Sequence, residues 1–310
     1  MNALAPVALA GLAIAAAESV ARRWQDPLAR DLSGDYSQLP LATQRLTPQA
    51  VRHALRIVVL GDSIPFGWPL AAHDGYPARL EALLRARYPG RPLAVINSSI
   101  GGHTAVMALA RVERDLVRWR PHIALLGFGL NDCHLARTAL DERRERAMYR
   151  QQRLDGRLRA LLRRSALLVL LRRALRPAPL PARRTATADE AIVAPGHPRV
   201  SPLAYAKALR SLVRQARRAG ARPCLLTMTP LGPAALAATP GWRLDIYQAF
   251  DALLRQVAAQ EGAALIDVGA AFPSGPALAP LLARDGVHLT AQGQALLAEA
   301  IANELEGRYL

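Results

Sequence analysis

The sequence LRIVVLGDSI at residues 55–64 joins an apolar run to a short polar turn. The apolar run, residues 55–60, predicts a buried strand. Ser63 then lies where this strand ends and the chain turns. Open α/β sheets place their active sites at the carboxyl ends of their strands, so Ser63 is a candidate nucleophile.

A base for this serine is present near the C-terminus, in the segment DGVH at residues 285–288. A serine hydroxyl is a poor nucleophile until a base accepts its proton, and His288 is the candidate base. Asp285 lies three residues earlier, so one turn can present both side chains. In such an arrangement the carboxylate orients the imidazole and stabilises its charged form. Ser63, His288 and Asp285 are therefore predicted to form a catalytic triad.

Two further loops carry donors for the oxyanion of a tetrahedral intermediate, which needs preorganised hydrogen bonds. Gly101 and Gly102 follow the apolar run at residues 93–96, and without Cβ atoms their N–H groups can approach a substrate oxygen. Asn131 follows the strand-like run at residues 123–128 and offers an amide. Because the carboxyl ends of parallel strands meet at one edge of a sheet, these loops are expected to converge on the serine.

Strands and helices are predicted to alternate along the chain. Apolar runs predict about five strands, at residues 55–60, 93–97, 123–128, 223–229 and 264–268. Helical spacing of apolar residues predicts helices at residues 76–87, 104–119, 202–219, 242–261 and 290–305, with Gly220 as a stop signal. This alternation is typical of an α/β fold whose parallel sheet is covered by helices on both faces.

These four motifs resemble the blocks of the SGNH (GDSL-like) hydrolase family in residue, order and spacing. The matching positions are Ser63 in GDS, Gly102 in NSSIGGHT, Asn131 in GLND and His288 in DGVH. The resemblance covers about residues 55–304 and is silent on the first fifty residues. Similar sequences often have Asp or Asn where this chain has His103.

The resemblance implies a flavodoxin-like three-layer α/β/α sandwich, the SGNH hydrolase fold. It also implies hydrolysis of carboxylic esters through an acyl-enzyme, with no metal and no cofactor. The implied oxyanion hole consists of the Ser63 N–H, the Gly102 N–H and the Asn131 side chain. The adjacent Gly101 remains an alternative donor, because the two glycines form a doublet.

Five residues beside these motifs have more than one interpretation: Asp62, His103, Asp132, Cys133 and His134. The two aspartates are interpreted first as hydrogen-bond acceptors that fix the loops, since the triad is complete without them. All five are also candidates to line the pocket, because they lie close to the motifs in sequence. The two cysteines of the chain show no metal-binding spacing.

The net charge of +16 raises the question of a nucleic-acid partner. Most of this charge is local: residues 137–184 contain fifteen arginines against four acidic residues, and so account for +11 of the total. The rest of the chain is only mildly basic. An aromatic content of 5% offers few side chains on which bases could stack, which argues against nucleic-acid binding.

The basic stretch belongs to a predicted insertion at about residues 137–198. Residues 158–175 predict a leucine-rich helix flanked by arginines. One interpretation is a helix that lies in a membrane surface, with arginines reaching toward anionic head groups. The other is a lid whose leucines pack on the catalytic domain, since the apolar run is too short to span a bilayer. Residues 176–198 are rich in proline and predict a mobile connection that gates the substrate.

The N-terminal residues 3–17 form an almost unbroken apolar run, which favours a secretory signal or a membrane anchor. Arginines follow this run rather than precede it, so a helix packed on a cytoplasmic protein is the alternative. We expect residues 1–50 to hold this segment and an irregular arm. Residues 51–306 are expected to form one catalytic domain, because the hydrophobic content of 51% is ample for a core.

Together the motifs predict a serine hydrolase that cleaves carboxylic esters of small molecules, lipids or carbohydrates. An acyltransferase that passes the same acyl group to a sugar or lipid hydroxyl is the alternative within enzymes. A membrane- or nucleic-acid-binding protein without catalysis would be expected to have lost at least one of the four blocks. The oligomeric state and the natural ester are left open by the sequence.

Overall fold

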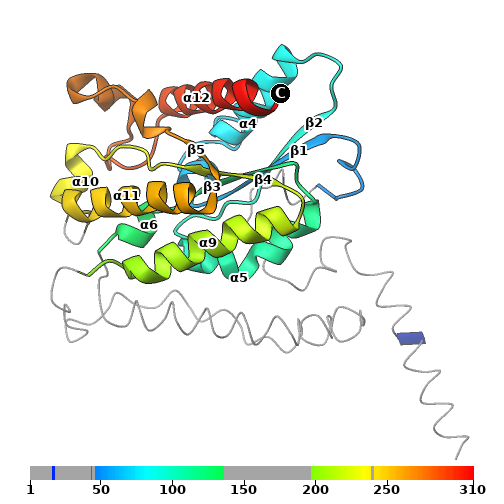
Figure 1. Cartoon of the computed structure of the whole chain (residues 1–310). Helices are drawn as coiled ribbons and strands as arrows, with labels where there is room; N and C mark the ends of the chain where they lie inside the picture. The colour runs from blue at the N-terminus through cyan, green and yellow to red at the C-terminus, as the bar shows by residue number, and fades with distance from the viewer. Residues whose placement is uncertain (1–15, 18–42, 44–45, 136–196, 239–240) are drawn as a thin grey trace, which may run out of the picture. The chain divides into compact units, whose positions relative to one another are not determined.

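The computed structural model describes residues 16–17, 43, 46–135, 197–238 and 241–310 (Figure 1). The chain divides into two compact units. One comprises Met1–Tyr36 and Arg150–Ala191, of which only residues 16 and 17 are described. The other comprises Ser37–Tyr149 and Ile192–Leu310, and it contains all the elements named below.

A five-stranded, all-parallel sheet forms the centre of this second unit (Figure 1). The strands are β1 (Leu55–Gly61), β2 (Leu93–Asn97), β3 (Ile123–Gly127), β4 (Arg222–Leu226) and β5 (Ala264–Ile266). Their order in the sheet is β2-β1-β3-β4-β5. This order is that of flavodoxin-like folds, and it confirms the predicted α/β class.

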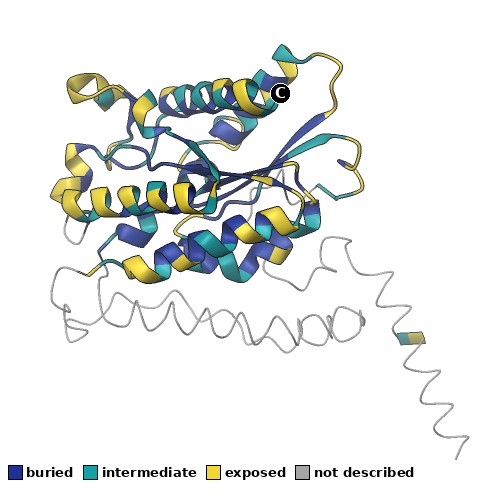
Figure 2. Ribbon diagram, viewed as in Figure 1, coloured by how far each residue is buried: buried dark blue, intermediate teal, exposed yellow. Residues whose placement is uncertain are grey.

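The strands are buried because helices cover the sheet on both sides. In β1 the five residues Ile57 to Gly61 are all buried, as expected for a strand with no solvent face (Figure 2). The strands β4 and β5 end at Leu226 and Ile266, two or three residues earlier than predicted. Side-chain contacts follow there instead: Thr227 Oγ1 donates to Asp267 Oδ1 and accepts from Gly269 N–H, both at 3.0 Å.

Five longer helices flank the sheet. Helices α4 (Tyr76–Arg87) and α12 (Ala291–Tyr309) pack together on one face, and α5 (Ala105–Asp115), α9 (Pro202–Arg218) and α11 (Leu244–Glu261) lie on the other (Figure 1). The predicted helix at residues 104–119 breaks at Leu116 and continues as the 3-10 turn η2 (Val117–Trp119). Gly220, the predicted stop signal, has a φ of 85° directly after α9.

Shorter elements complete the described unit. They are α3 (Ser63–Phe66), α6 (Leu130–Cys133), α10 (Pro233–Ala237) and the 3-10 turns η3 (Gly269–Ala271) and η4 (Gly275–Leu281). Helix α3 follows β1 after the single residue Asp62, and α6 follows β3 after Phe128 and Gly129. They are the elements that hold the candidate site.

The strand order creates a crevice at the carboxyl ends of β1 and its two neighbours. The chain leaves β1 for β2 on one side and returns to β3 on the other, so the connections diverge at this point. In register, β1 Val59 pairs with Asn97 of β2, and Gly61 pairs with Gly127 of β3. The loops after these three strands therefore start at the same edge, where flavodoxin-like sheets bind their ligands.

The segments predicted as the N-terminal signal or anchor, the irregular arm and the basic insertion lie almost entirely outside the described residues. Among them are the leucine-rich stretch at residues 158–175 and the proline-rich connection after it. Within the part of the chain that the structure describes, no helix combines the length and apolarity needed to cross a bilayer.

Candidate active site

Ser63 is the first residue of α3, at the point where β1 turns out of the sheet. The turn is held by Asp62, whose Oδ1 accepts a 3.0 Å hydrogen bond from the Ile64 N–H. It is also tight, because a Cβ added at Gly61 would lie 2.8 Å from the Gly127 carbonyl oxygen on β3. As the first residue of a helix, Ser63 has no intrahelical acceptor for its own N–H.

His288 reaches this serine from the loop before α12. Its Nε2 lies 2.9 Å from Ser63 Oγ, across 225 residues of sequence. The loop is pinned at its base, where Ala283 N–H donates to the His288 carbonyl at 2.7 Å and Leu282 bridges Leu289. The structure thus brings together the serine and histidine that the sequence predicts as partners.

Asp285 lies on the other side of the imidazole, with its Oδ2 2.6 Å from His288 Nδ1. Its Oδ1 accepts from the N–H groups of Val287 and His288 at 2.9 and 3.0 Å, so the carboxylate closes its own turn. Partial burial alone would raise the pKa of Asp285, but these three hydrogen bonds outweigh it and hold that pKa below 3.8. An ionised carboxylate at Nδ1 keeps the proton there and leaves the Nε2 lone pair for the serine hydroxyl.

A cavity of about 290 Å³ opens in front of Ser63, and we call it the serine cavity. Its lining residues are Ser63, Trp68, Gly101, Gly102, Leu130, Asn131, Trp242, Val287 and His288. All the residues predicted to supply oxyanion donors therefore lie on its wall, both glycines of the doublet included. Gly102 has a φ of 76°, a backbone conformation that favours glycine.

The Asn131 side chain is held from two sides. Its Nδ2 donates to Asp62 Oδ2 at 3.3 Å, and its Oδ1 accepts from Arg199 Nη1 at 3.2 Å. A guanidinium can only donate and a carboxylate can only accept, so these partners fix which end of the amide is nitrogen. One Nδ2 hydrogen remains for a ligand in the serine cavity.

Asp62 lies behind the serine rather than on the wall of the serine cavity. It is only 3% exposed and borders a separate inner cavity of about 30 Å³, together with Tyr76 and Thr229. Burial raises the pKa of Asp62 from 3.8 to about 6, although the Ile64 and Asn131 hydrogen bonds and His288 act in the opposite direction. The interpretation as a loop-fixing acceptor describes its contacts better than that of a pocket-lining residue.

The other four proposed pocket residues do not reach the serine cavity either. Asp132 is buried and accepts from the Ala105 N–H at the start of α5, at 3.0 Å from Oδ1. Cys133 is buried, and its Sγ contacts the Leu130 carbonyl at 3.5 Å. Burial also raises the pKa of the Cys133 thiol far above its usual range.

The two histidines lie one layer behind the cavity wall. His134 packs edge-to-face against Trp242, with ring centroids 4.4 Å apart. His103 accepts at Nδ1 from Arg111 Nε at 3.1 Å. Burial and the nearby arginines lower the pKa of His103 to about 3, so it stays neutral. Both side chains are half-buried and contact Arg111 and Trp242 rather than lining the serine cavity, so proximity in sequence did not predict their direction.

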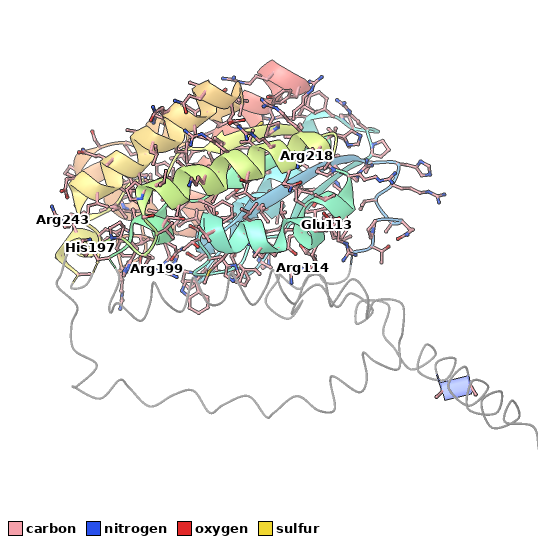
Figure 3. All side chains as sticks on the ribbon, turned by 60° about the horizontal axis from the view of Figure 1, so that its bottom comes forward. Glu113, Arg114, His197, Arg199, Arg218 and Arg243 are labelled. Atoms are coloured by element: carbon pink, nitrogen blue, oxygen red, sulfur yellow. The ribbon has the colours of Figure 1, made fainter. Side chains whose placement is uncertain are left out.

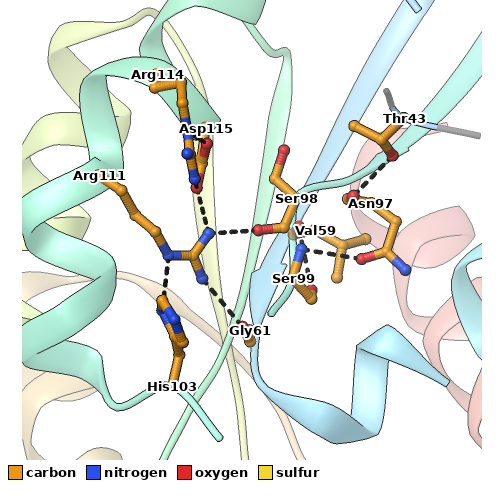
Figure 4. Close-up of polar contacts among 10 residues, drawn as sticks. All are labelled: Thr43, Val59, Gly61, Asn97, Ser98, Ser99, His103, Arg111, Arg114 and Asp115. Carbon is orange, nitrogen blue, oxygen red and sulfur yellow. Dashed lines mark hydrogen bonds and ion pairs between the residues drawn. The ribbon is translucent and has the colours of Figure 1, made fainter. Parts of the chain in front are cut away.

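Behind the glycine doublet, the buried Arg111 ties the loop to two strands (Figure 4). Its Nη1 donates to the Ser98 carbonyl at 2.6 Å, and its Nη2 donates to the Gly61 carbonyl at 3.2 Å. It also forms a buried ion pair with Asp115 one turn further along α5. This one side chain connects the end of β1, the end of β2 and, through His103, the glycine doublet.

Sequence reasoning missed Trp68, Trp242 and Arg199. Trp68 is 56% exposed on the cavity wall, only five residues after the serine. Trp242 donates from Nε1 to the Leu130 carbonyl at 2.8 Å, directly beside Asn131. An exposed tryptophan close to a motif was a usable signal, whereas nothing in the sequence connects residues 199 and 242 with residue 131.

The described residues contain no group of three or more His, Cys, Asp or Glu side chains placed to hold a metal ion. The arrangement that they do contain is a serine hydroxyl, an imidazole, a carboxylate hydrogen-bonded to that imidazole, and several N–H donors around one cavity. Such a set can attack and stabilise a polarised carbonyl.

Comparison with known proteins agrees with this geometry. The sequence model of the GDSL-like Lipase/Acylhydrolase family matches residues 59–296. None of the curated proteins compared with the chain matches it.

Several solved structures share the fold. A lipase/acylhydrolase from Enterococcus faecalis is 18% identical with a TM-score of 0.54, covering 82% of this chain and 96% of its own. LAE5, an alpha/beta hydrolase enzyme from the metagenome of Lake Arreo, Spain, is 25% identical with a TM-score of 0.50, covering 80% and 93%. A catalytic mutant of Axe2, an acetylxylan esterase from Geobacillus stearothermophilus, is 21% identical with a TM-score of 0.51, covering 81% and 93%.

The family match extends from β1 to α12 and includes all four motifs around the serine cavity. The chain therefore belongs to the GDSL-like lipase/acylhydrolase family, and it is a hydrolase with the SGNH fold.

Proposed function

We propose that this protein is a serine esterase that hydrolyses carboxylic esters through an acyl-enzyme. The observation that carries the proposal is the continuous chain from Ser63 Oγ to His288 at 2.9 Å and from His288 to Asp285 at 2.6 Å. Both distances are within hydrogen-bond range, and the turn that holds Asp285 and His288 lies 225 residues from Ser63 in sequence.

Acylation begins when Ser63 Oγ attacks the ester carbonyl carbon and its proton passes to His288 Nε2. The carbonyl π electrons move to the oxygen, which becomes the oxyanion. The imidazolium, stabilised by Asp285, then gives its proton to the leaving alcohol oxygen as the C–O bond breaks. The products of this half-reaction are the alcohol and a Ser63 ester.

The oxyanion is stabilised by donors on the wall of the serine cavity. We assign this role to the Ser63 N–H, the Gly102 N–H and the free Nδ2 hydrogen of Asn131, with Gly101 as the alternative backbone donor. Donors of this kind act on the charge that develops in the transition state, which is why they raise kcat rather than only binding.

Deacylation repeats these steps with water as the nucleophile. His288 takes a proton from water as the water oxygen attacks the acyl carbon, and it returns that proton to Ser63 Oγ when the acid leaves. An acyltransferase would share the first half-reaction and use a sugar or lipid hydroxyl in place of water. An alcohol added to the assay distinguishes the two, because a transferase forms a new ester in preference to free acid.

The apolar wall of the cavity supports an ester with an apolar part, since Trp68, Leu130, Trp242 and Val287 all line it. Lipid esters satisfy this chemistry. Acetylated carbohydrates do so as well, because a sugar ring can stack on an exposed tryptophan. One of the similar structures is named as an acetylxylan esterase, which makes acetylated sugars a class to test.

The test is hydrolysis of p-nitrophenyl esters from acetate to palmitate by wild type, Ser63→Ala and the control Ser274→Ala, whose serine is exposed and does not line the serine cavity. We expect activity in the wild type and the control and its loss in Ser63→Ala. Activity that survives in Ser63→Ala would reject the nucleophile, and no turnover of any ester by wild type would reject the esterase.

A further inference from the structure

Arg199 contacts both loops that line the oxyanion side of the serine cavity. Its Nη1 donates to the Asn131 Oδ1 at 3.2 Å and to the Gly102 carbonyl at 3.3 Å. No motif contains this residue, and it is not itself on the cavity wall. It lies between residues 136–196, which are outside the described part of the chain, and α9 (Figure 3).

The backbone around Arg199 is anchored beside the asparagine. Its N–H donates to the His134 carbonyl at 2.9 Å, and the next N–H, that of Val200, donates to the Asp132 carbonyl at 3.1 Å. An isolated antiparallel bridge joins Leu135 to Pro198. The residues on both sides of Arg199 are thereby paired with the residues that follow Asn131.

The contact with Asn131 selects one orientation of its amide. Rotation of an asparagine side chain about χ2 exchanges oxygen and nitrogen at little torsional cost, so neighbours must choose between the two states. Arg199 offers only donors, which the amide oxygen accepts and the amide nitrogen cannot. In the opposite orientation the oxygen would face Asp62 and the oxyanion, both of which repel it.

The contact with Gly102 restrains the second loop. This glycine has a φ of 76°, and nothing lies within 4 Å of the position where its Cβ would be, so side-chain packing does not hold it. A hydrogen bond to its carbonyl supplies that restraint. One guanidinium group therefore spans the two loops whose donors must point at the same oxygen.

We propose that Arg199 is a positioning residue of the oxyanion hole: it holds the Asn131 amide with its nitrogen toward the substrate oxygen and ties that side chain to the Gly102 loop. The inference rests on the proposed esterase function, and it adds a residue that the family motifs do not include. Arg199 acts through Asn131 and Gly102 and takes no part in proton transfer.

This role predicts a loss in kcat rather than in substrate binding. Deleting an oxyanion donor outright lowers kcat by about 10² to 10³. A misoriented donor should have a smaller effect, so we expect Arg199→Gln to lower kcat by roughly 10- to 100-fold with KM changed less than about threefold. Arg199→Lys should keep part of the activity, because an ammonium can still donate to these acceptors but lacks the planar guanidinium that holds its donors in a fixed geometry.

Two measurements separate positioning from a general structural role. In an Asn131→Ala background, Arg199→Gln should have almost no further effect on kcat, because the two residues act as a unit. In Arg199→Ala, guanidinium ion below denaturing concentrations should restore part of kcat. The control is Arg218→Gln, which removes the same charge from an exposed position at the end of α9 (Figure 3).

Additive losses in the double variant, or kcat unchanged in Arg199→Gln with its melting temperature also unchanged, would overturn the proposal. If wild type hydrolyses no ester, the esterase assignment fails. The side-chain amide NMR signal of Asn131 then tests separately whether Arg199 orients this amide. An Asn131 signal that is the same in wild type and Arg199→Gln overturns the positioning role. A signal that shifts in Arg199→Gln but not in Arg218→Gln supports it.

Discussion

The Asn131 amide donates to the Asp62 carboxylate at 3.3 Å directly behind the serine. This carboxylate is almost completely buried, and the desolvation raises its pKa to about 6. The acceptor that orients the amide is therefore kept in an environment that disfavours its charged form. Ionisation of Asp62 at neutral pH therefore lowers the free energy of unfolding, but it provides the charged acceptor that orients the Asn131 amide.

Asp62→Asn should make the folded protein more stable at about pH 8 but not at about pH 4. The pKa is 3.8 ordinarily and about 6 in the folded state, so between these values the folded state binds more protons than the unfolded state. The free energy of unfolding then falls as the pH rises from 3.8 to about 6. Above that range the buried charge lowers it by its full amount, on the order of 2 to 3 kcal/mol. Urea denaturation at both pH values measures the difference, and an equal gain at both would contradict the buried charge as its source.

The same substitution should lower kcat. An amide at position 62 can donate as well as accept, so it no longer selects the nitrogen end of Asn131. We expect a roughly tenfold fall in kcat at pH 8, a part of the effect of losing the donor. A variant that is both more stable and fully active would show that Asp62 does not orient the amide.

Asp285→Asn should reduce kcat by about 10² to 10⁴ with little change in KM, because the histidine loses the acceptor that fixes its tautomer. The carboxylate is 49% exposed, so its removal should hardly affect folding. The control is Asp245→Asn, which removes a carboxylate from an exposed pair with Arg243. Steady-state kinetics of the two variants suffices, and equal effects would remove Asp285 from the triad.

The two tryptophans of the serine cavity should respond differently to replacement. Trp68→Ala removes an exposed ring, so we expect KM to rise roughly fivefold, equivalent to about 1 kcal/mol of lost contact, with an unchanged melting temperature. Trp242→Ala also removes the hydrogen bond to the Leu130 carbonyl and the contact with His134, and should lower the stability by about 3 kcal/mol. Kinetics and thermal melts on both variants test this contrast, which fails if the two behave alike.

The sequence predicted the strands and helices that depend on local patterns of apolar residues. Continuous apolar runs mark β1 to β3, and the boundaries of α4 match the prediction because the helical spacing begins after Gly75. The motif residues Ser63, Gly102 and Asn131 line one cavity because they follow parallel strands, and the alternation of strands and helices already indicates this. These predictions needed only periodicity and sheet topology.

The contacts that tune the site are not predictable in this way. Arg199 and Trp242 meet Asn131 and Leu130 through folding of segments that are about 70 and 110 residues away in sequence. His103 and Cys133 adjoin motif residues but turn toward Arg111 and the Leu130 carbonyl, because φ and ψ of the short loops decide side-chain direction. Spacing in sequence therefore identified the loops and could not assign each side chain to the cavity or the core.

Arg111 offers the last test, because a buried guanidinium connects the loops of the site (Figure 4). It pairs with the buried Asp115 and donates to the Ser98 and Gly61 carbonyls. Arg111→Met would leave these acceptors without this donor, and Asp115 with one arginine partner fewer. Breaking one side of a buried ion pair typically costs about 3 to 5 kcal/mol, so we expect a loss of this size in the free energy of unfolding.

The matched control is Arg308→Met, which removes an arginine from a half-exposed i,i+4 pair with Glu304 on α12. Exposed pairs contribute at most about 1 kcal/mol because water screens them and both side chains lose entropy. Urea denaturation of the two variants compares a buried network with a surface pair at the same change of charge. A loss in Arg111→Met no larger than that in Arg308→Met would mean that the network does not hold the end of β1 to the glycine doublet, and that packing of α5 on the sheet positions the loop instead.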